Sequence, residues 1–218
     1  MGGKKLVIFD MDGTLIDSVD FIVWSFVEAS KALGLDVDPT LIKQNLGRTL
    51  DDLVREAFIA RGYDEGPVKA MLEIRNKLAE ESWRKAVRPF PEAAEVLARL
   101  KAMNYMVGVA SSAKEERVVE YLEYFGLLRF VDFVCGLREG IRGKPHPDVL
   151  LEVVRMARLR PSDSIYVGDA LADCLAAQAA GMDFVAVDRD GASWNSAGAY
   201  ACRPLGVVRR LTEIFAYV

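Results

Sequence analysis

The sequence has little of what secreted, membrane-spanning or disulfide-stabilised proteins depend on. Its 218 residues include only three cysteines, at positions 135, 174 and 202, with no CxxC pair. This odd, widely spaced set argues against a disulfide framework and predicts three small, buried, free thiols in a reducing compartment. No stretch approaches the ~20 apolar residues of a bilayer span, and the apolar run after Lys5 is too short for a signal peptide. We therefore expect a cytoplasmic protein with no membrane partner.

An excess of basic residues is also absent. Lys and Arg total 28 against 32 for Asp and Glu, for a net charge of -4. A nucleic-acid surface normally shows a basic stripe, so we expect no nucleic-acid partner. Asparagine and glutamine are scarce, a compositional trait of thermophile proteins. Hydrophobic residues make up 51% of the chain, which suffices for one large domain or a domain with a small accessory lobe.

Five short segments are predicted to form a parallel sheet that is covered on both faces. They are nearly continuous in apolar and β-branched residues, and polar residues or glycine bound them. The segments are residues 6–9, 106–110, 130–134, 164–167 and 183–187. Helical patterns lie between them, at residues 111–126, 146–159 and 171–181. This alternation predicts an α/β fold with a doubly wound, mainly parallel, Rossmann-like sheet.

One interval interrupts the alternation. Residues 17–87 contain no strand pattern and read as helices, and Pro89 and Pro91 mark the return to the sheet. We interpret residues 17–87 as an inserted α-helical cap domain on a catalytic core formed by residues 1–16 and 88–218. Trp24 and Trp83 are expected to pack inside this cap.

Polar side chains follow three of the predicted strands where each strand ends. Because ligands in open parallel sheets bind beyond the carboxyl ends of the strands, these side chains should converge. A lysine in the loop before the strand at 164–167 should join them. The set consists of Asp10, Asp12, Ser111, Ser112, Lys144, Asp169 and Asp173.

The charges of this set point to a metal ion and a phosphate. Four carboxylates and one ammonium need further positive charge to stay close together, and a hard divalent cation such as Mg²⁺ prefers oxygen ligands. Lys144 and Ser111 are suitable donors to phosphate oxygens, as are backbone N–H groups of the loops. Asp10 is then free to attack phosphorus, while Asp12 protonates the leaving oxygen and later activates water. Gly13 lets the backbone turn so that the two carboxylates point in different directions.

Four segments in order carry a family resemblance: DMDGT (10–14), VGVASS (107–112), GKPHPD (143–148) and VGDALAD (167–173). Together they resemble the haloacid dehalogenase (HAD) superfamily of Mg²⁺-dependent phosphatases, and the helical insert is similar to that superfamily's class-one cap. The resemblance implies Asp10 as nucleophile, Asp12 as acid and base, and a Mg²⁺ ion on Asp10, the backbone carbonyl of Asp12 and Asp169. Asp173 would act in or near this ligand set.

Within the superfamily the chain is most similar to phosphoglycolate phosphatase-like enzymes, which act on small phosphorylated metabolites. Dehalogenases lack the aspartate found here as Asp12, and phosphonoacetaldehyde hydrolases use a cap lysine where this chain has Arg48. We expect Arg48, together with Ser111, Ser112 and Lys144, to bind the substrate. Many relatives carry a hydroxyl residue at the position of Ala170, so hydrogen bonds near the site should differ.

Two alternatives stay open at this point. A β-phosphoglucomutase-like phosphotransferase is disfavoured because the only histidine, His146, does not follow the first motif. A non-catalytic, receiver-like phospho-acceptor module also holds acidic residues, a hydroxyl and a lysine on a parallel sheet, but such modules are shorter and have no helical insert. Either a monomer or a homodimer is compatible with the sequence.

Overall fold

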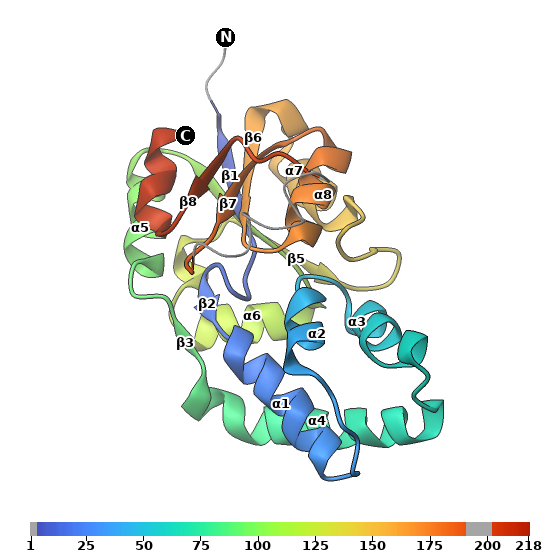
Figure 1. The fold of residues 1–218 in the computed structure, drawn as a ribbon. Coiled ribbons are helices and arrows are strands. Elements are labelled where there is room, and N and C mark those ends of the chain that lie inside the picture. Colours follow the sequence, from blue (N-terminus) through green and yellow to red (C-terminus); the bar gives the residue numbers. More distant parts are fainter. Residues whose placement is uncertain (1–3, 191–201) are drawn as a thin grey trace.

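A six-stranded parallel sheet is the centre of the fold, in a computed structural model that describes residues 4–190 and 202–218 (Figure 1). Its strand order is β5-β4-β1-β6-β7-β8, and every neighbouring pair is parallel. The strands are β1 (Leu6–Phe9), β4 (Met106–Lys114), β5 (Phe133–Leu137), β6 (Ser164–Gly168), β7 (Asp183–Val187) and β8 (Gly206–Val208). The expected doubly wound architecture is confirmed.

Strand boundaries agree with the sequence pattern except at three places. The third predicted strand, 130–134, begins three residues later, because residues 128–130 form a 3-10 turn and pack their apolar side chains from that turn. β4 continues to Lys114, past a register shift after Ala110. β8 was not predicted, since three residues are too short for a recognisable pattern.

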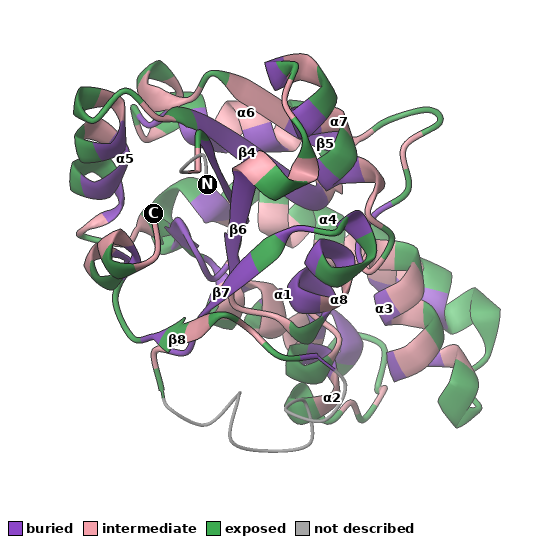
Figure 2. Ribbon diagram, turned by 90° about the horizontal axis from the view of Figure 1, so that it is seen from above, coloured by how far each residue is buried: buried purple, intermediate pink, exposed green. Residues whose placement is uncertain are grey.

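Alternation along β1 explains why both faces of the sheet are covered. Val7 and Phe9 belong to one apolar cluster, and Leu6 and Ile8 belong to the other. Figure 2 shows the central strands buried and the outer sides of the helices exposed. The first cluster includes residues of α5 (Ala93–Ala102) and α6 (Glu115–Tyr124), and the second includes residues of α7 (Asp148–Ala157) and α8 (Leu171–Ala180). α8 ends at Ala180, within one residue of the predicted pattern, and its C-cap Gly181 has a left-handed φ of 68°.

The inserted helices form a separate group beyond the carboxyl end of β1, in the lower half of Figure 1. They are α1 (Val19–Lys31), α2 (Pro39–Gln44), α3 (Leu50–Ala57) and α4 (Glu65–Ala86), with their own apolar cluster around Phe26, Phe58 and Met71. Their connections to the core form a short antiparallel ribbon of β2 (Ile16–Asp17) and β3 (Arg88–Pro89). The domain boundaries proposed from the sequence run through this ribbon and stay an interpretation.

The prediction that both tryptophans pack inside the cap is wrong. Trp83 is fully buried, but it stacks on Tyr121 of α6 at 4.3 Å between ring centroids and so belongs to the core cluster. The 22-residue helix α4 extends far enough to bring its last turns to α6. Trp24 is 40% exposed and stacks on Phe21. Periodicity identified the helices without identifying which neighbours they meet.

The prediction of three free thiols is also wrong. Cys174 of α8 and Cys202, which precedes β8, form a disulfide across 28 positions of sequence. Cys135 is free and buried as expected. Nothing in the spacing of the cysteines indicated the pair, because the strand order that brings Cys202 beside α8 includes the unpredicted β8. Within residues 4–190 and 202–218, no helix combines the length and apolar character that crossing a bilayer requires.

Candidate active site

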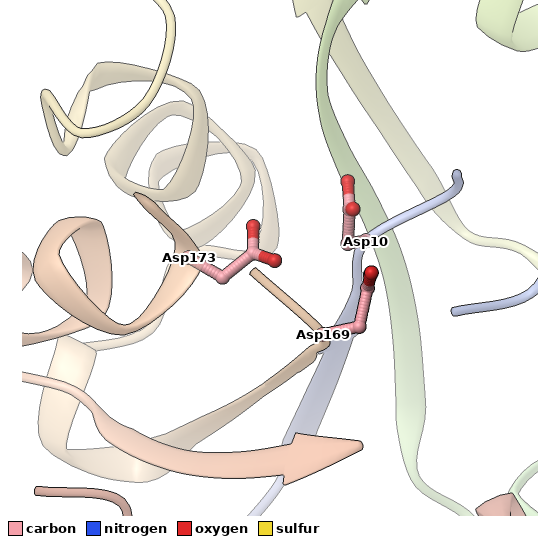
Figure 3. A group of neighbouring side chains, drawn as sticks. All are labelled: Asp10, Asp169 and Asp173. Atoms are coloured by element: carbon pink, nitrogen blue, oxygen red, sulfur yellow. The ribbon is translucent and has the colours of Figure 1, made fainter. Parts of the chain in front are cut away.

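Three of the predicted carboxylates meet at the carboxyl edge of the sheet (Figure 3). Asp10 directly follows β1, and Asp169 directly follows β6, its hydrogen-bonded neighbour. Asp173 comes from the first turn of α8. Each offers an oxygen that lies within 4.8 Å of the others. The convergence follows from topology, because neighbouring parallel strands end at the same edge.

Lys144 is the cation between these acids. Its Nζ donates to Asp10 Oδ1 and to Asp173 Oδ1, both at 2.6 Å, and the side chain is only 1% exposed. Burial alone lowers the pKa of this ammonium, but the charges of Asp10 and Asp173 outweigh it and raise the pKa. The lysine is therefore charged throughout the physiological range, as its proposed role requires.

Tyr166 is a member of this network that the sequence pattern did not reveal. It lies fully buried on β6, and its hydroxyl is 2.9 Å from Asp173 Oδ1, 3.2 Å from the Ala110 carbonyl and 3.2 Å from Lys144 Nζ. Its hydroxyl group within an otherwise apolar strand was the available signal, since a buried tyrosine O–H normally has a partner.

The acids exceed the cations at this edge. Burial is the main cause that raises the pKa of Asp10 well above its ordinary value, followed by the charge of Asp173. Burial, followed by the charge of Asp173, raises the pKa of Asp169 to about 7. The hydroxyl of Thr14 donates to Asp169 Oδ1 at 2.9 Å and partly opposes this rise. When all three carboxylates are ionised, one ammonium leaves two negative charges uncompensated, which a divalent cation can offset.

The carboxylate oxygens are not equally free to hold such a cation. Asp173 Oδ1 accepts from Lys144 and lies within hydrogen-bond distance of Tyr166, while Asp173 Oδ2 accepts from the backbone N–H of Ala170 at 2.9 Å. Asp10 keeps Oδ2 and Asp169 keeps one oxygen without a partner among the described residues. The donor set therefore fits a hard divalent ion on Asp10 and Asp169, with Asp173 fixing Lys144 behind them.

Asp12 is not one of the three carboxylates of this cluster. Its Oδ1 accepts from the hydroxyl of Ser18 at 2.6 Å, and it lines the cavity described below. Burial raises the pKa of Asp12, and the hydrogen bond from Ser18 partly opposes this rise. Gly13 makes the intervening turn with φ at 81°, and a Cβ there would lie 2.3 Å from Asp169 Oδ2. A glycine is needed at this position both for the turn and for the close approach of Asp169.

The two serines after the predicted strand core have different bonds. Ser111 Oγ accepts from the N–H of Ala113 at 3.1 Å, and no described group accepts its hydroxyl hydrogen. Ser112 Oγ donates to the Gly47 carbonyl at 2.8 Å and accepts from the N–H of Lys144 at 3.1 Å. The geometry favours Ser111 as a phosphate donor, because the Ser112 hydrogen is already used.

Gly47 is one of the places where the cap touches the core, next to the candidate site. Besides accepting from Ser112, it lies so close to Ala170 that an added Cβ would be 2.6 Å from the Ala170 Cβ. A hydroxyl residue at position 170 would therefore place its oxygen at the cap contact. The N–H of Ala170 donates to Asp173, so the alanine keeps the backbone hydrogen bond at this position.

A cavity of about 140 Å³ lies between the core loops and the cap. Asp10, Asp12, Ser111, Ser112, Lys144 and Asp169 line it from the core side. The cap contributes mostly apolar residues, namely Val19, Ile22, Phe26, Leu46, Leu50 and Leu53. Two cap arginines also line it: the predicted Arg48 and the unpredicted Arg75 of α4. The cavity thus has a charged core side and an apolar cap side that carries two cations.

A buried acid after the first strand, a lysine and a second acid pair at the edge of a Rossmann-like sheet, under an inserted helical cap, define a class of phosphate-processing hydrolases. Residues 7–187 match the family described as haloacid dehalogenase-like hydrolases, and the chain belongs to that family. It is a hydrolase of the phosphatase type within that family.

Named relatives agree with this class. A phosphoglycolate phosphatase of Pseudomonas fluorescens is 31% identical over 84% of this chain and 69% of its own. A protein of Clostridium perfringens provisionally named pyrophosphatase PpaX is 26% identical over 94% of this chain and 95% of its own. The crystal structure of a predicted phosphoglycolate phosphatase from Haemophilus somnus superposes with a TM-score of 0.85 at 25% identity, over 99% of this chain and 98% of that one.

Proposed function

We propose that the chain is a Mg²⁺-dependent phosphatase that hydrolyses a small phosphomonoester metabolite, similar to phosphoglycolate, through an aspartyl-phosphate intermediate. The observation that carries the proposal is the buried Asp10 held by Lys144 beside Asp169, at the core side of a cavity that Asp12 also lines.

Asp10, Asp169 and the backbone carbonyl of Asp12 would hold Mg²⁺, and Asp173 would support them through Lys144. When bound, the ion offsets the charge of the carboxylates and of the phosphate, which lowers the cost of bringing two anions together. Two raised carboxylate pKa values and the excess of negative charge support this assignment.

The reacting groups act in two steps. Asp10 attacks phosphorus while Asp12 gives its proton to the leaving oxygen, so that the alcohol departs neutral and Asp10 carries the phosphoryl group. Asp12 then takes a proton from water, whose oxygen attacks phosphorus and releases phosphate with Asp10 restored. Because burial raises the pKa of Asp12, its protonated form is more available near neutral pH than that of an exposed aspartate.

Lys144 and Ser111 bind the phosphate in this scheme. Lys144 also limits rotation of Asp10 by holding Oδ1. The hydroxyl hydrogen of Ser111 has no acceptor among the described residues and is free for a phosphate oxygen. Ser112 acts on the same loop, where it joins Lys144 to Gly47.

Hydrolysis of p-nitrophenyl phosphate tests the proposal. We expect turnover that requires Mg²⁺ and is abolished by EDTA, and we expect Asp10→Asn to reduce it to background while circular dichroism shows an intact fold. Asp17→Asn, which removes an exposed carboxylate on β2, is the matched control and should keep its activity. Acid-quenched wild-type protein should carry a phosphoryl group by mass spectrometry. Turnover by Asp10→Asn at the wild-type rate would remove the nucleophile assignment.

A further inference from the structure

We propose that Arg75 selects substrates with a second anionic group, which it binds from the cap side of the cavity that Asp10 and Lys144 line from the core side. This inference rests on the proposed function and names the class of substrate for the same site. A short, doubly anionic phosphate compound is the ligand that it implies.

The side chain of Arg75 is restrained by hydrogen bonds and by an aromatic ring. Its Nε donates to the hydroxyl of Ser25 at 3.1 Å, and its Nη1 donates to Asn76 Oδ1 at 3.1 Å. The guanidinium carbon lies 5.0 Å from the ring centroid of Phe26. Ser25 in turn donates to the Ile22 carbonyl at 2.7 Å. These contacts use Nε and Nη1 and so restrain the guanidinium, and Nη2 has no hydrogen bond to a described residue.

The charge of Arg75 has no counterion in direct contact. No carboxylate of residues 4–190 and 202–218 lies within ion-pair distance of Arg75 or of Arg48, although both line the cavity. Burial lowers the pKa of the Arg75 guanidinium, and more distant charges, Asp12 among them, only partly oppose this. Arg75 is half-buried, and because a cation that is partly removed from water gains from a partner, an anion in the cavity is the natural complement.

The position of Arg75 defines the shape of that anion. The phosphate donors Lys144 and Ser111 belong to core loops, whereas Arg75 belongs to α4 of the cap. Apolar cap residues such as Val19 and Ile22 line the same cavity. A ligand that satisfies both groups has a phosphate for Lys144 and Ser111, a second anionic group for Arg75, and few polar atoms between the two.

The size of the cavity limits the spacer. Its volume of about 140 Å³ is close to the ~150 Å³ of an engineered protein cavity that accommodates benzene. A two-carbon phosphorylated acid or pyrophosphate is small enough for a cavity of this size. Arginine also suits both candidate anions, because its planar fork matches carboxylate and phosphate oxygens.

A comparison of substrates with and without a second anionic group separates substrate binding by Arg75 from a general effect of the substitution on the active site. The assay compares 2-phosphoglycolate with ethyl phosphate, in which a methyl group replaces the carboxylate. Pyrophosphate is added as a second compound that has two anionic groups. Wild-type protein should prefer at least one of the two doubly anionic compounds over ethyl phosphate in kcat/KM. Arg75→Gln should reduce that preference by roughly 10- to 100-fold, the usual range for a lost charge-assisted hydrogen bond.

Two further variants complete the design. Arg84→Gln removes the same charge from the same helix at an exposed position paired with Glu120, and it should leave the preference unchanged. Arg75→Lys keeps the charge but loses the planar pair of guanidinium donors, so it should reduce the preference by less than Arg75→Gln does. If circular dichroism shows that Arg75→Gln does not fold, the test uses Arg75→Lys instead. Selective loss on pyrophosphate alone would identify the second anion as phosphate, and loss on phosphoglycolate alone as carboxylate.

Three results would overturn the inference. An equal loss on all three substrates would mean that Arg75 supports the cap or Asp12 and does not bind substrate. A wild-type protein with no preference for a second anion would refute the selection while Mg²⁺-dependent turnover of ethyl phosphate kept the proposed function intact. No Mg²⁺-dependent turnover of any monoester would refute the proposed function and this inference together.

Discussion

Replacing Lys144 by methionine tests whether the acids at the sheet edge depend on this one cation. The side chain is 1% exposed and its Nζ lies 2.6 Å from oxygens of both Asp10 and Asp173. Methionine has nearly the same length, so little cavity is created. The change removes the ammonium and leaves the buried carboxylates facing each other.

The magnitude follows from burial more than from distance. At an effective dielectric constant of about 20, unit charges at this separation attract by roughly 6 kcal/mol per pair, and the desolvation of the ammonium offsets much of that. Removing one partner of a buried pair typically costs about 3–5 kcal/mol. We expect that loss in metal-free urea denaturation, and it is a large share of the ~5–15 kcal/mol by which domains are stable.

Lys101→Met is the matched control. Lys101 also lies 2.6 Å from a carboxylate oxygen, that of Asp132, but the two side chains are 36% and 31% exposed. An exposed pair contributes about 0–1 kcal/mol, so this variant should lose no more than that. If Lys144→Met loses as little as Lys101→Met, the argument from burial is refuted.

The pH dependence gives a second measurement on the same protein. The pKa of Asp10 is raised by burial and by Asp173, and Lys144 is the neighbour that lowers it. Without the lysine the folded state should hold its protons to higher pH than the unfolded state does. Stability then falls as pH rises, because the folded state binds more protons. The gap between Lys144→Met and wild type should therefore widen from about pH 5 to 8, and Mg²⁺ should narrow it. Adding Asp173→Asn should recover stability but not activity.

Two other predictions concern the cap and the disulfide. Gly47→Ala should lower kcat/KM about 10- to 100-fold, because the added Cβ would lie 2.6 Å from the Cβ of Ala170. The control Gly62→Ala also has a left-handed φ, at 86°, but open space around it, so it should lose similar stability and keep its activity. Equal kcat/KM values in the two variants would contradict the cap contact. Cys202→Ser should lower the free energy of unfolding by about 3–4 kcal/mol in non-reducing buffer, as expected for a loop closed across 28 positions. Dithiothreitol should bring wild type to the same value, and a wild type insensitive to it would refute that account.

The part of the site on the sheet could be predicted because strand ends are local features of the sequence. Asp10 and Asp169 each follow a continuous apolar run, and parallel neighbours must place such ends at one edge. Periodicity does not mark Lys144, because its loop has no strand pattern. The prediction for Lys144 depended on the segment GKPHPD (143–148) that surrounds it. Tyr166 was missed because an apolar strand is read for its periodicity and its single hydroxyl carries no periodic signal.

The cap side was less predictable for a physical reason. A helix in the cap can turn either face to its neighbours, and the sequence pattern gives the apolar face without naming the partner. Arg75 follows Ile74 in the middle of α4 and reads as a solvated charge until Ser25 of α1 is placed against it. Trp83 was misplaced for the same reason, since its partner Tyr121 lies on a core helix. The catalytic residues that we propose are thus encoded at strand ends, while the substrate selection that we propose for Arg75 depends on contacts between helices that only the folded structure defines.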